Sequence, residues 1–220
     1  MRTHRDEVST VEMIVGGALV LMAALGGVYF AFRPASGLVD GWFLDLVGSS
    51  HSPWFSHMTS LRYPAVIIVA AVIAAGICLP RDRPRALACL IGPPLALLAS
   101  ELLFKPMVGR TLGGSLSYPS GSTVGAAALA TAAVLATSLR WRVGAVALAS
   151  AYALWMSVAV VALRWHYPTD ALAGLAVGVG VVLVVDGLAW QVARRAGLRW
   201  VQSRPSVRAA PPDRVLEPRH

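Results

Sequence analysis

Three short segments of this chain carry the side chains best suited to chemistry. The first runs from Lys105 to Arg110 and supplies two cations, and the second is the polar turn Ser120-Gly121-Ser122-Thr123. The third places His166 four residues before Asp170. Cations and the backbone amides of a glycine turn bind anions, and a histidine held by a carboxylate is a nucleophile or a base. Together these residue types indicate a site that holds a phosphate group and attacks it.

Each segment also has a plainer interpretation. Residues four apart share a helix face, so Asp170 can orient one nitrogen of His166, but an interfacial histidine beside a helix-capping aspartate fits the same spacing. The serines of the second segment could simply cap the helix predicted to follow them. Lys105 is the only lysine among 19 lysine and arginine residues, yet it could merely pair with Glu101, one helical turn earlier.

Composition places these segments in a membrane protein. Of the 220 residues, 56% are hydrophobic and the mean hydropathy is +0.64, which is too apolar for an ordinary soluble domain. The net charge of +8 does not indicate nucleic-acid binding, because the arginines lie between apolar stretches and no nucleic-acid motif is present. A crossing helix needs about 20 apolar residues. Six stretches meet this requirement approximately: 13–32, 64–80, 86–104, 123–139, 143–163 and 171–193.

The arginines also predict the orientation. Most of them lie at the two ends of the chain and in the loops around residues 81–85 and 140–142, which the positive-inside rule assigns to the cytoplasm. Both termini are then cytoplasmic and all three chemical segments face outward from the plasma membrane. We expect a cytoplasmic N-terminus over 1–12, a six-span domain over 13–193 and a basic, disordered cytoplasmic tail over 194–220.

Two further segments carry structural expectations. The first outer loop, about 33–63, interleaves aromatic and polar residues and predicts one or two interfacial helices between the first two spans. Gly174, Gly178 and Gly180 predict close helix packing by the last span. Asp186, in the same span, is expected to pair with Arg194 or Arg140.

The three segments, in this order and at these span boundaries, resemble the signature of the type 2 phosphatidic acid phosphatase (PAP2) superfamily. That signature reads K-x6-R-P, then P-S-G-H, then S-R-x5-H-x3-D, and the resemblance covers about residues 60–190. It implies an all-α, six-helix transmembrane bundle with an outward-facing site. It also implies a phosphatase of lipid phosphates or polyprenyl pyrophosphates that needs no metal and no cofactor. The implied partners are a phosphorylated lipid and the bilayer, and no oligomeric state is indicated.

The resemblance also implies roles for individual residues. His166 would be the nucleophile that is transiently phosphorylated, and Asp170 would orient it. Lys105, Ser120 and Gly121 would bind the phosphoryl oxygens.

Two family arginines are displaced in this chain. The position expected for the first holds Leu112, and an arginine stands two residues earlier, at Arg110. The position expected for the second holds Val160, and Arg164 follows one helical turn later. Because a guanidinium is long and a helical turn rises only about 5.4 Å, we predict that Arg110 and Arg164 are relocated phosphate ligands.

A third departure affects the proton donor. Ser122 stands where the family has the histidine that protonates the leaving group. A serine hydroxyl is a poor acid, and general acid catalysis is typically worth roughly 10²–10⁴-fold. His51 or His57 could substitute, although nothing in the sequence brings them there. On the strength of the resemblance we still expect a phosphatase, with Ser122 at the catalytic position of the missing histidine. The alternatives are an impaired relative that binds phosphorylated lipid, a transporter or structural protein, and a phosphotransferase that passes the phosphoryl group to an acceptor other than water.

Overall fold

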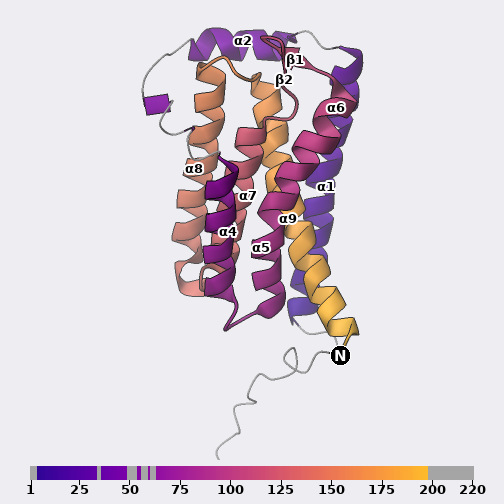
Figure 1. The fold of residues 1–220 in the computed structure, drawn as a ribbon, viewed down its shortest axis with the longest axis vertical. Helices are drawn as coiled ribbons and strands as arrows, with labels where there is room; N and C mark the ends of the chain where they lie inside the picture. Colours follow the sequence, from indigo (N-terminus) through magenta and orange to yellow (C-terminus); the bar gives the residue numbers. More distant parts are fainter. Residues whose placement is uncertain (1–3, 34–35, 49–53, 56–58, 60–62, 198–220) are drawn as a thin grey trace, which may run out of the picture.

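The computed structural model describes residues 4–33, 36–48, 54–55, 59 and 63–197. Long helices stand side by side in one bundle, and the short helix α2 (Leu38–Val47) lies across one end of it (Figure 1). The other main helices are α1 (His4–Phe32), α4 (Pro64–Cys78), α5 (Arg83–Leu98), α7 (Gly121–Ala136), α8 (Arg142–Ala162) and α9 (Pro168–Arg195).

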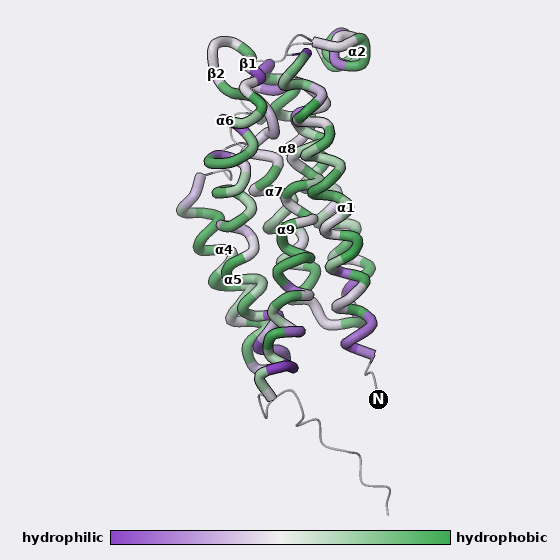
Figure 2. Tube along the Cα trace, turned by 90° about the vertical axis from the view of Figure 1, so that its right-hand side faces the viewer, coloured by the Kyte–Doolittle hydropathy of each residue, from purple (hydrophilic) through white to green (hydrophobic). Residues whose placement is uncertain are grey.

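Length and hydropathy confirm the predicted all-α membrane fold. Among the described residues, four helical stretches are long and apolar enough to cross a bilayer: His4–Phe32, Arg83–Val108, Leu139–Ala162 and Pro168–Arg195. Two shorter apolar helices, Pro64–Cys78 and Gly121–Ala136, stand beside them (Figure 1). Hydrophobic residues cover the middle of the bundle and hydrophilic ones gather toward its two ends (Figure 2).

The helices depart from the predicted boundaries at both ends of the chain. α1 already begins at His4, so most of the segment assigned to a cytoplasmic N-terminus continues the first helix. α9 ends at Arg195, and residues 198–220 of the predicted tail lie outside the described part of the chain. In the first outer loop, α2 is helical as expected. The predicted replacement acids His51 and His57 also lie outside the described residues.

α9 is the central helix, packed against α1, α5, α7 and α8. Its glycines make this packing close. A Cβ at Gly178 would lie 2.5 Å from the carbonyl oxygen of Val124 in α7, and a Cβ at Gly180 would lie 2.7 Å from that of Gly16 in α1. Backbones that approach this closely leave no room for a side chain, which confirms the packing predicted for the last span.

The third long stretch contains a widened turn. Between α5 and the short helix α6 (Lys105–Val108), a π-helix, η2, spans Ala99–Phe104, and the N–H of Lys105 bonds to the carbonyl of Ser100. Pro106 follows directly. A proline ring inside an α-helix clashes with the carbonyl four residues earlier, and a wider turn relieves this clash. The distortion sets the direction in which Glu101 and Lys105 leave the helix.

A small hairpin follows α6. Strands β1 (Thr111–Leu112) and β2 (Ser115–Leu116) pair antiparallel around Gly113 and Gly114, which both have positive φ. The hairpin leads into a buried segment from Ser117 to Ser120 that enters α7. Within this segment, the Tyr118 hydroxyl donates to the carbonyl of Ala23 at 2.6 Å and fixes the segment to α1.

At the opposite end of the bundle, Asp186 does not pair as predicted. It lies fully buried in α9 and forms ion pairs with Arg5 of α1 at 2.9 Å and Arg85 of α5 at 3.1 Å. Arg194 pairs instead with Asp6 at 3.4 Å. The prediction was wrong because no sequence pattern shows that α1 and α5 flank α9 in space and bring Arg5 and Arg85 to Asp186.

Candidate active site

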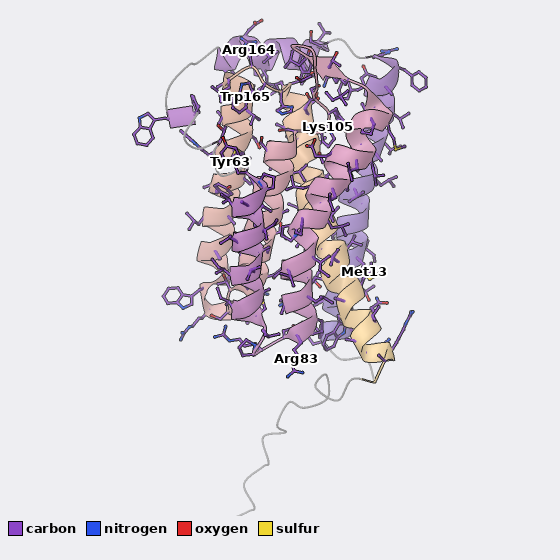
Figure 3. All side chains as sticks on the ribbon, viewed as in Figure 1. Met13, Tyr63, Arg83, Lys105, Arg164 and Trp165 are labelled. Atoms are coloured by element: carbon purple, nitrogen blue, oxygen red, sulfur yellow. The ribbon has the colours of Figure 1, made fainter. Side chains whose placement is uncertain are left out.

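The three chemical segments meet at the end of the bundle that α2 covers. Lys105, Arg164 and Trp165 lie toward this end, and Arg83 lies at the other (Figure 3). A series of contacts connects the segments. His166 reaches the buried segment at Ser117, the N–H of Ser120 donates to the Asp170 carbonyl at 3.0 Å, and Gly121 lies against the Lys105 side chain.

His166 lies in the loop between α8 and α9, with its side chain mostly buried. Its Nδ1 is 2.8 Å from the carbonyl oxygen of Ser117, while the nearest Asp170 oxygen is 4.0 Å away. A carbonyl can only accept a hydrogen bond, so Nδ1 carries a proton and the lone pair of the neutral ring is on Nε2. The Ser117 carbonyl therefore fixes the tautomer of His166, and the Asp170 carboxylate lies farther away on the same Nδ1 side of the ring. Sequence reasoning missed Ser117, because a backbone carbonyl has no residue-type signal.

Asp170 is held firmly at the start of α9. Its Oδ2 accepts the N–H of Tyr167 at 3.0 Å, which is how a carboxylate three residues into a helix satisfies the N-terminal amide. Its Oδ1 accepts from Arg110 at 2.6 Å, and the side chain has no exposed surface. The helix start and the cation therefore fix both oxygens of this carboxylate.

Arg110 lies in a different setting from the one expected of a phosphate ligand. Its side chain is fully buried, and its guanidinium lies 3.9 Å from the ring centre of Phe30 and 4.0 Å from that of Tyr167. One of its nitrogens contacts Asp170 and another contacts Asp40 of α2 at 2.5 Å. Arg110 thus joins two buried carboxylates, a geometry that suits the planar guanidinium.

Asp40 is the second residue that sequence reasoning missed. Besides Arg110, it accepts hydrogen bonds from the backbone N–H of Thr169 at 3.1 Å and from the Thr169 hydroxyl at 2.9 Å. It brings α2 down onto the first turn of α9. The only sequence signal is an acidic residue in an otherwise apolar stretch, and Asp45 gives the same signal five residues later.

Lys105 and Glu101 form the ion pair expected from their spacing, with Nζ 2.7 Å from Oε1. The pair lies against the N-terminus of α7. A Cβ at Gly121 would overlap Oε1 of Glu101 and would lie 3.7 Å from Nζ of Lys105. Glycine at this position therefore lets a carboxylate and an ammonium approach the first turn of a helix, where N–H groups favour anions.

Ser120, Ser122 and Arg164 occupy distinct positions around this helix start. Ser120 is buried and caps α7, since its hydroxyl accepts from the N–H of Thr123 at 3.4 Å. Ser122 is nearly buried in the first turn. Arg164 has a left-handed backbone, with φ of 59°, and donates to the carbonyl of Leu44 at 2.9 Å, which attaches the α8–α9 loop to α2.

Tyr118 remains neutral in this charged surrounding. Burial, and then the negative charge of Asp170, raise the pKa of Tyr118 to about 12, with Arg110 opposing them. The phenol therefore keeps its proton across the physiological range and remains a donor to Ala23.

The sequence profile of the PAP2 superfamily matches residues 61–194, which is more than half of the chain and includes all three segments. The protein belongs to the PAP2 superfamily. No curated protein matches the chain.

A solved structure shares the fold of this PAP2 protein. It is described as the first transmembrane PAP2 type phosphatidylglycerolphosphate phosphatase from Bacillus subtilis. The TM-score is 0.63 at 21% sequence identity, and the match covers 80% of this chain and 98% of that one. The likeness confirms the predicted PAP2-type membrane fold.

Proposed function

We propose that this protein is a metal-independent phosphatase of lipid phosphates or polyprenyl pyrophosphates, with its site on the outer face of the plasma membrane. The observation that carries the proposal is the setting of His166. Its Nδ1 is held by the Ser117 carbonyl in front of a buried carboxylate, in a chain that belongs to the PAP2 superfamily. An imidazole oriented in this way presents Nε2 as a nucleophile.

The proposed reaction has two steps. Nε2 of His166 attacks phosphorus and the bond to the lipid oxygen breaks, which leaves a phosphohistidine that water then hydrolyses. The Asp170 charge stabilises the cationic ring that forms during attack, as in other histidine–carboxylate pairs. Lys105, Arg164 and the first turn of α7 at Gly121 and Ser122 are the proposed ligands of the phosphoryl oxygens.

For Ser120 and Arg110 the geometry favours supporting roles. Ser120 uses its hydroxyl as the cap of α7 and its N–H on the Asp170 carbonyl, so it shapes the phosphate site and joins it to α9. Arg110 positions Asp170 from a site without solvent exposure. We therefore assign both to positioning and leave direct phosphate contact to the more accessible groups.

α2 supports a lipid substrate. It lies across the end of the bundle that holds the site, and Leu38, Trp42 and Leu46 are 96%, 61% and 66% exposed (Figure 1). Apolar and aromatic side chains exposed on a surface helix are typical of the membrane–water interface. A phosphorylated headgroup at this level would meet the site while its chains remain in the bilayer.

The test is phosphate release by the purified protein from a panel of lipid phosphates and polyprenyl pyrophosphates. His166→Ala should abolish turnover, and acid-labile phosphohistidine should be trapped from the parent protein after a rapid quench. The matched control is His4→Ala, which changes a histidine at the start of α1, at the end of the bundle away from the site. This variant should leave the rate unchanged. Full turnover by His166→Ala would refute the assignment.

Because Ser122 replaces the acid histidine, a second candidate function is a protein that binds phosphorylated lipid without turning it over. That candidate predicts saturable binding of the lipid phosphate, loss of binding in Lys105→Ala, and no phosphate release from any substrate in the panel.

A further inference from the structure

The first turn of α7 lacks the usual acid at Ser122 but has a carboxyl group beside it. Oε1 of Glu101 occupies the space that a side chain at Gly121 would fill, one residue before Ser122. The Glu101 side chain is 46% exposed, so a substrate can reach it. The place where the family signature has a proton donor is therefore next to a carboxyl group, supplied by the neighbouring helix.

Two features of the chain bring Glu101 to this place. The π-turn over Ala99–Phe104, which precedes Pro106, changes the direction of the helix at Glu101. Gly121 removes the side chain that would block the carboxylate. Single π-turns are found frequently at functional sites, and here the turn delivers both the carboxylate and Lys105.

We propose that Glu101 is the general acid of the reaction and replaces the histidine of the family signature. The proposal rests on the phosphatase function proposed above. In the resting protein the carboxylate pairs with Lys105, at 2.7 Å. A bound phosphate group attracts the Lys105 ammonium to its own oxygens and places negative charge beside the carboxylate. The carboxylate that has lost its partner takes up the proton that it later gives to the leaving oxygen, so substrate binding loads the acid.

The proton then follows a closed cycle. As Nε2 of His166 forms its bond to phosphorus and the P–O bond to the lipid breaks, the oxygen that leaves takes the proton of the Glu101 carboxyl group. The resulting carboxylate next accepts a proton from the water that attacks the phosphohistidine. Inorganic phosphate departs, His166 regains its neutral ring, and Glu101 is again a carboxylic acid until Lys105 returns to it.

The test compares leaving groups. Glu101→Gln removes the acidic proton and keeps the shape of the side chain. Its turnover of phosphatidic acid, whose leaving oxygen needs a proton, should fall by roughly 10²–10⁴-fold. Its turnover of p-nitrophenyl phosphate, whose leaving group needs none, should stay near that of the parent protein. In the parent protein, loss of the acid's proton should lower the rate on phosphatidic acid at high pH. This fall should be absent from the pH profile of Glu101→Gln, which has no such proton to lose.

Two variants at position 122 complete the design. Ser122→His in the Glu101→Gln background restores an acid and should recover turnover of phosphatidic acid. Ser122→His alone should not raise turnover of phosphatidic acid by the roughly 10²–10⁴-fold that supplying a missing acid would give, because the parent protein already has an acid. A large gain from Ser122→His alone would overturn the assignment even if Glu101→Gln failed to fold.

The remaining outcomes separate this inference from the function on which it rests. Equal losses on both substrates in Glu101→Gln, with the parent protein active, would overturn the acid role and leave the phosphatase intact. If neither the parent protein nor Ser122→His turned over either substrate or any polyprenyl pyrophosphate of the panel, the proposed function and the acid role would both be overturned.

Discussion

At the scale of single residues, the contact with the greatest consequence is the buried group of Asp40, Arg110 and Asp170. Two carboxylates share one guanidinium, and all three side chains are at most 1% exposed. A buried ion pair contributes little net stability when intact, but removing one member leaves a charge without compensation. Arg110 is therefore the residue on which both the α2 cap and the orientation of Asp170 depend.

Arg110→Met should destabilise the protein by about 3–5 kcal/mol, since two carboxylates would remain buried without their cation. Thermal unfolding in detergent measures this loss. Arg110→Lys should recover only part of it, because an ammonium cannot span two carboxylates or stack between Phe30 and Tyr167. A direct phosphate ligand would behave differently: Arg110→Met would then raise KM and leave thermal stability unchanged.

Asp40→Asn should shift the acid limb of the pH profile of kcat/KM to lower pH. The substitution removes one negative charge from the group behind His166, so Arg110 offsets more of the Asp170 charge and the protonated imidazole is less favoured. The neutral nucleophile then persists to lower pH. Asp45→Asn, on the exposed side of α2, is the matched control and should leave the profile unchanged. A shift toward higher pH in Asp40→Asn would contradict this electrostatic link.

These residues also show what the sequence could predict of the site. His166, Asp170, Lys105 and the glycine turn were predicted because their residue types and spacing are chemical signals. Asp40 lies 130 positions before Asp170, and no local pattern connects them. The partner of the histidine is a main-chain oxygen, which any residue could supply. Arg110 was found as a cation, but its burial between two rings depends on tertiary packing.

At the scale of the elements, the glycines of α9 control how closely the helices that carry the site approach one another. Gly178 lies one turn after Gly174, where a Cβ would lie 2.8 Å from the carbonyl oxygen of Ser120. The packing of α9 on α7 thus sets the distance between the start of α9, with Asp170, and the phosphate turn at Ser120–Gly121.

Gly178→Ala should destabilise the protein by about 1–3 kcal/mol, because the added methyl group meets backbone atoms of α7 that cannot rotate away. Activity should fall in parallel, because α7 and α9 move apart at the site. Gly17→Ala in α1 is the matched control, since a Cβ there has no neighbour within 4 Å, and it should be neutral or slightly stabilising. Equal melting temperatures of the two variants would show that the contact is not limiting.

The apolar stretches predicted that the helices exist. At most of the helix ends, the observed boundary differs from the predicted one by only a few residues. The π-turn, the hairpin after α6 and the contact of α2 with the first turn of α9 did not follow from the sequence. Each depends on how the end of one element meets another, for example Pro106 against the turn before it. Periodicity reports which face of a helix is apolar and not how the helix is distorted.

At the scale of the whole molecule, the placement of the arginines predicts which side of the membrane the site faces. The hairpin at Ser115 and the loop at Ser138 are both exposed, and they lie at opposite ends of the bundle (Figure 1). The native cysteines, Cys78 and Cys89, are both buried, so we expect little labelling of the parent protein by a thiol reagent. Labelling of a variant then reports the added cysteine.

Ser115→Cys should react with a membrane-impermeant maleimide in intact cells, because the positive-inside rule places this end outside. Ser138→Cys should react only after the cells are opened, since the arginine-rich loops hold that end in the cytoplasm. The measurement is the mass shift of the protein with and without lysis. The reverse pattern would place the site on the cytoplasmic side and exclude an outward-facing phosphatase.

The pairing of α1 with α9 has a consequence for biosynthesis. The first helix packs mainly on the last one, and Arg5 reaches its buried partner Asp186 only there. A ribosome releases α1 long before α9 exists, so until then Arg5 lacks its buried partner Asp186 and can pair with Glu12 of its own helix. Completion of the bundle is thus a late event in synthesis, and a chain that stops before α9 leaves the packing face of its first helix without a partner.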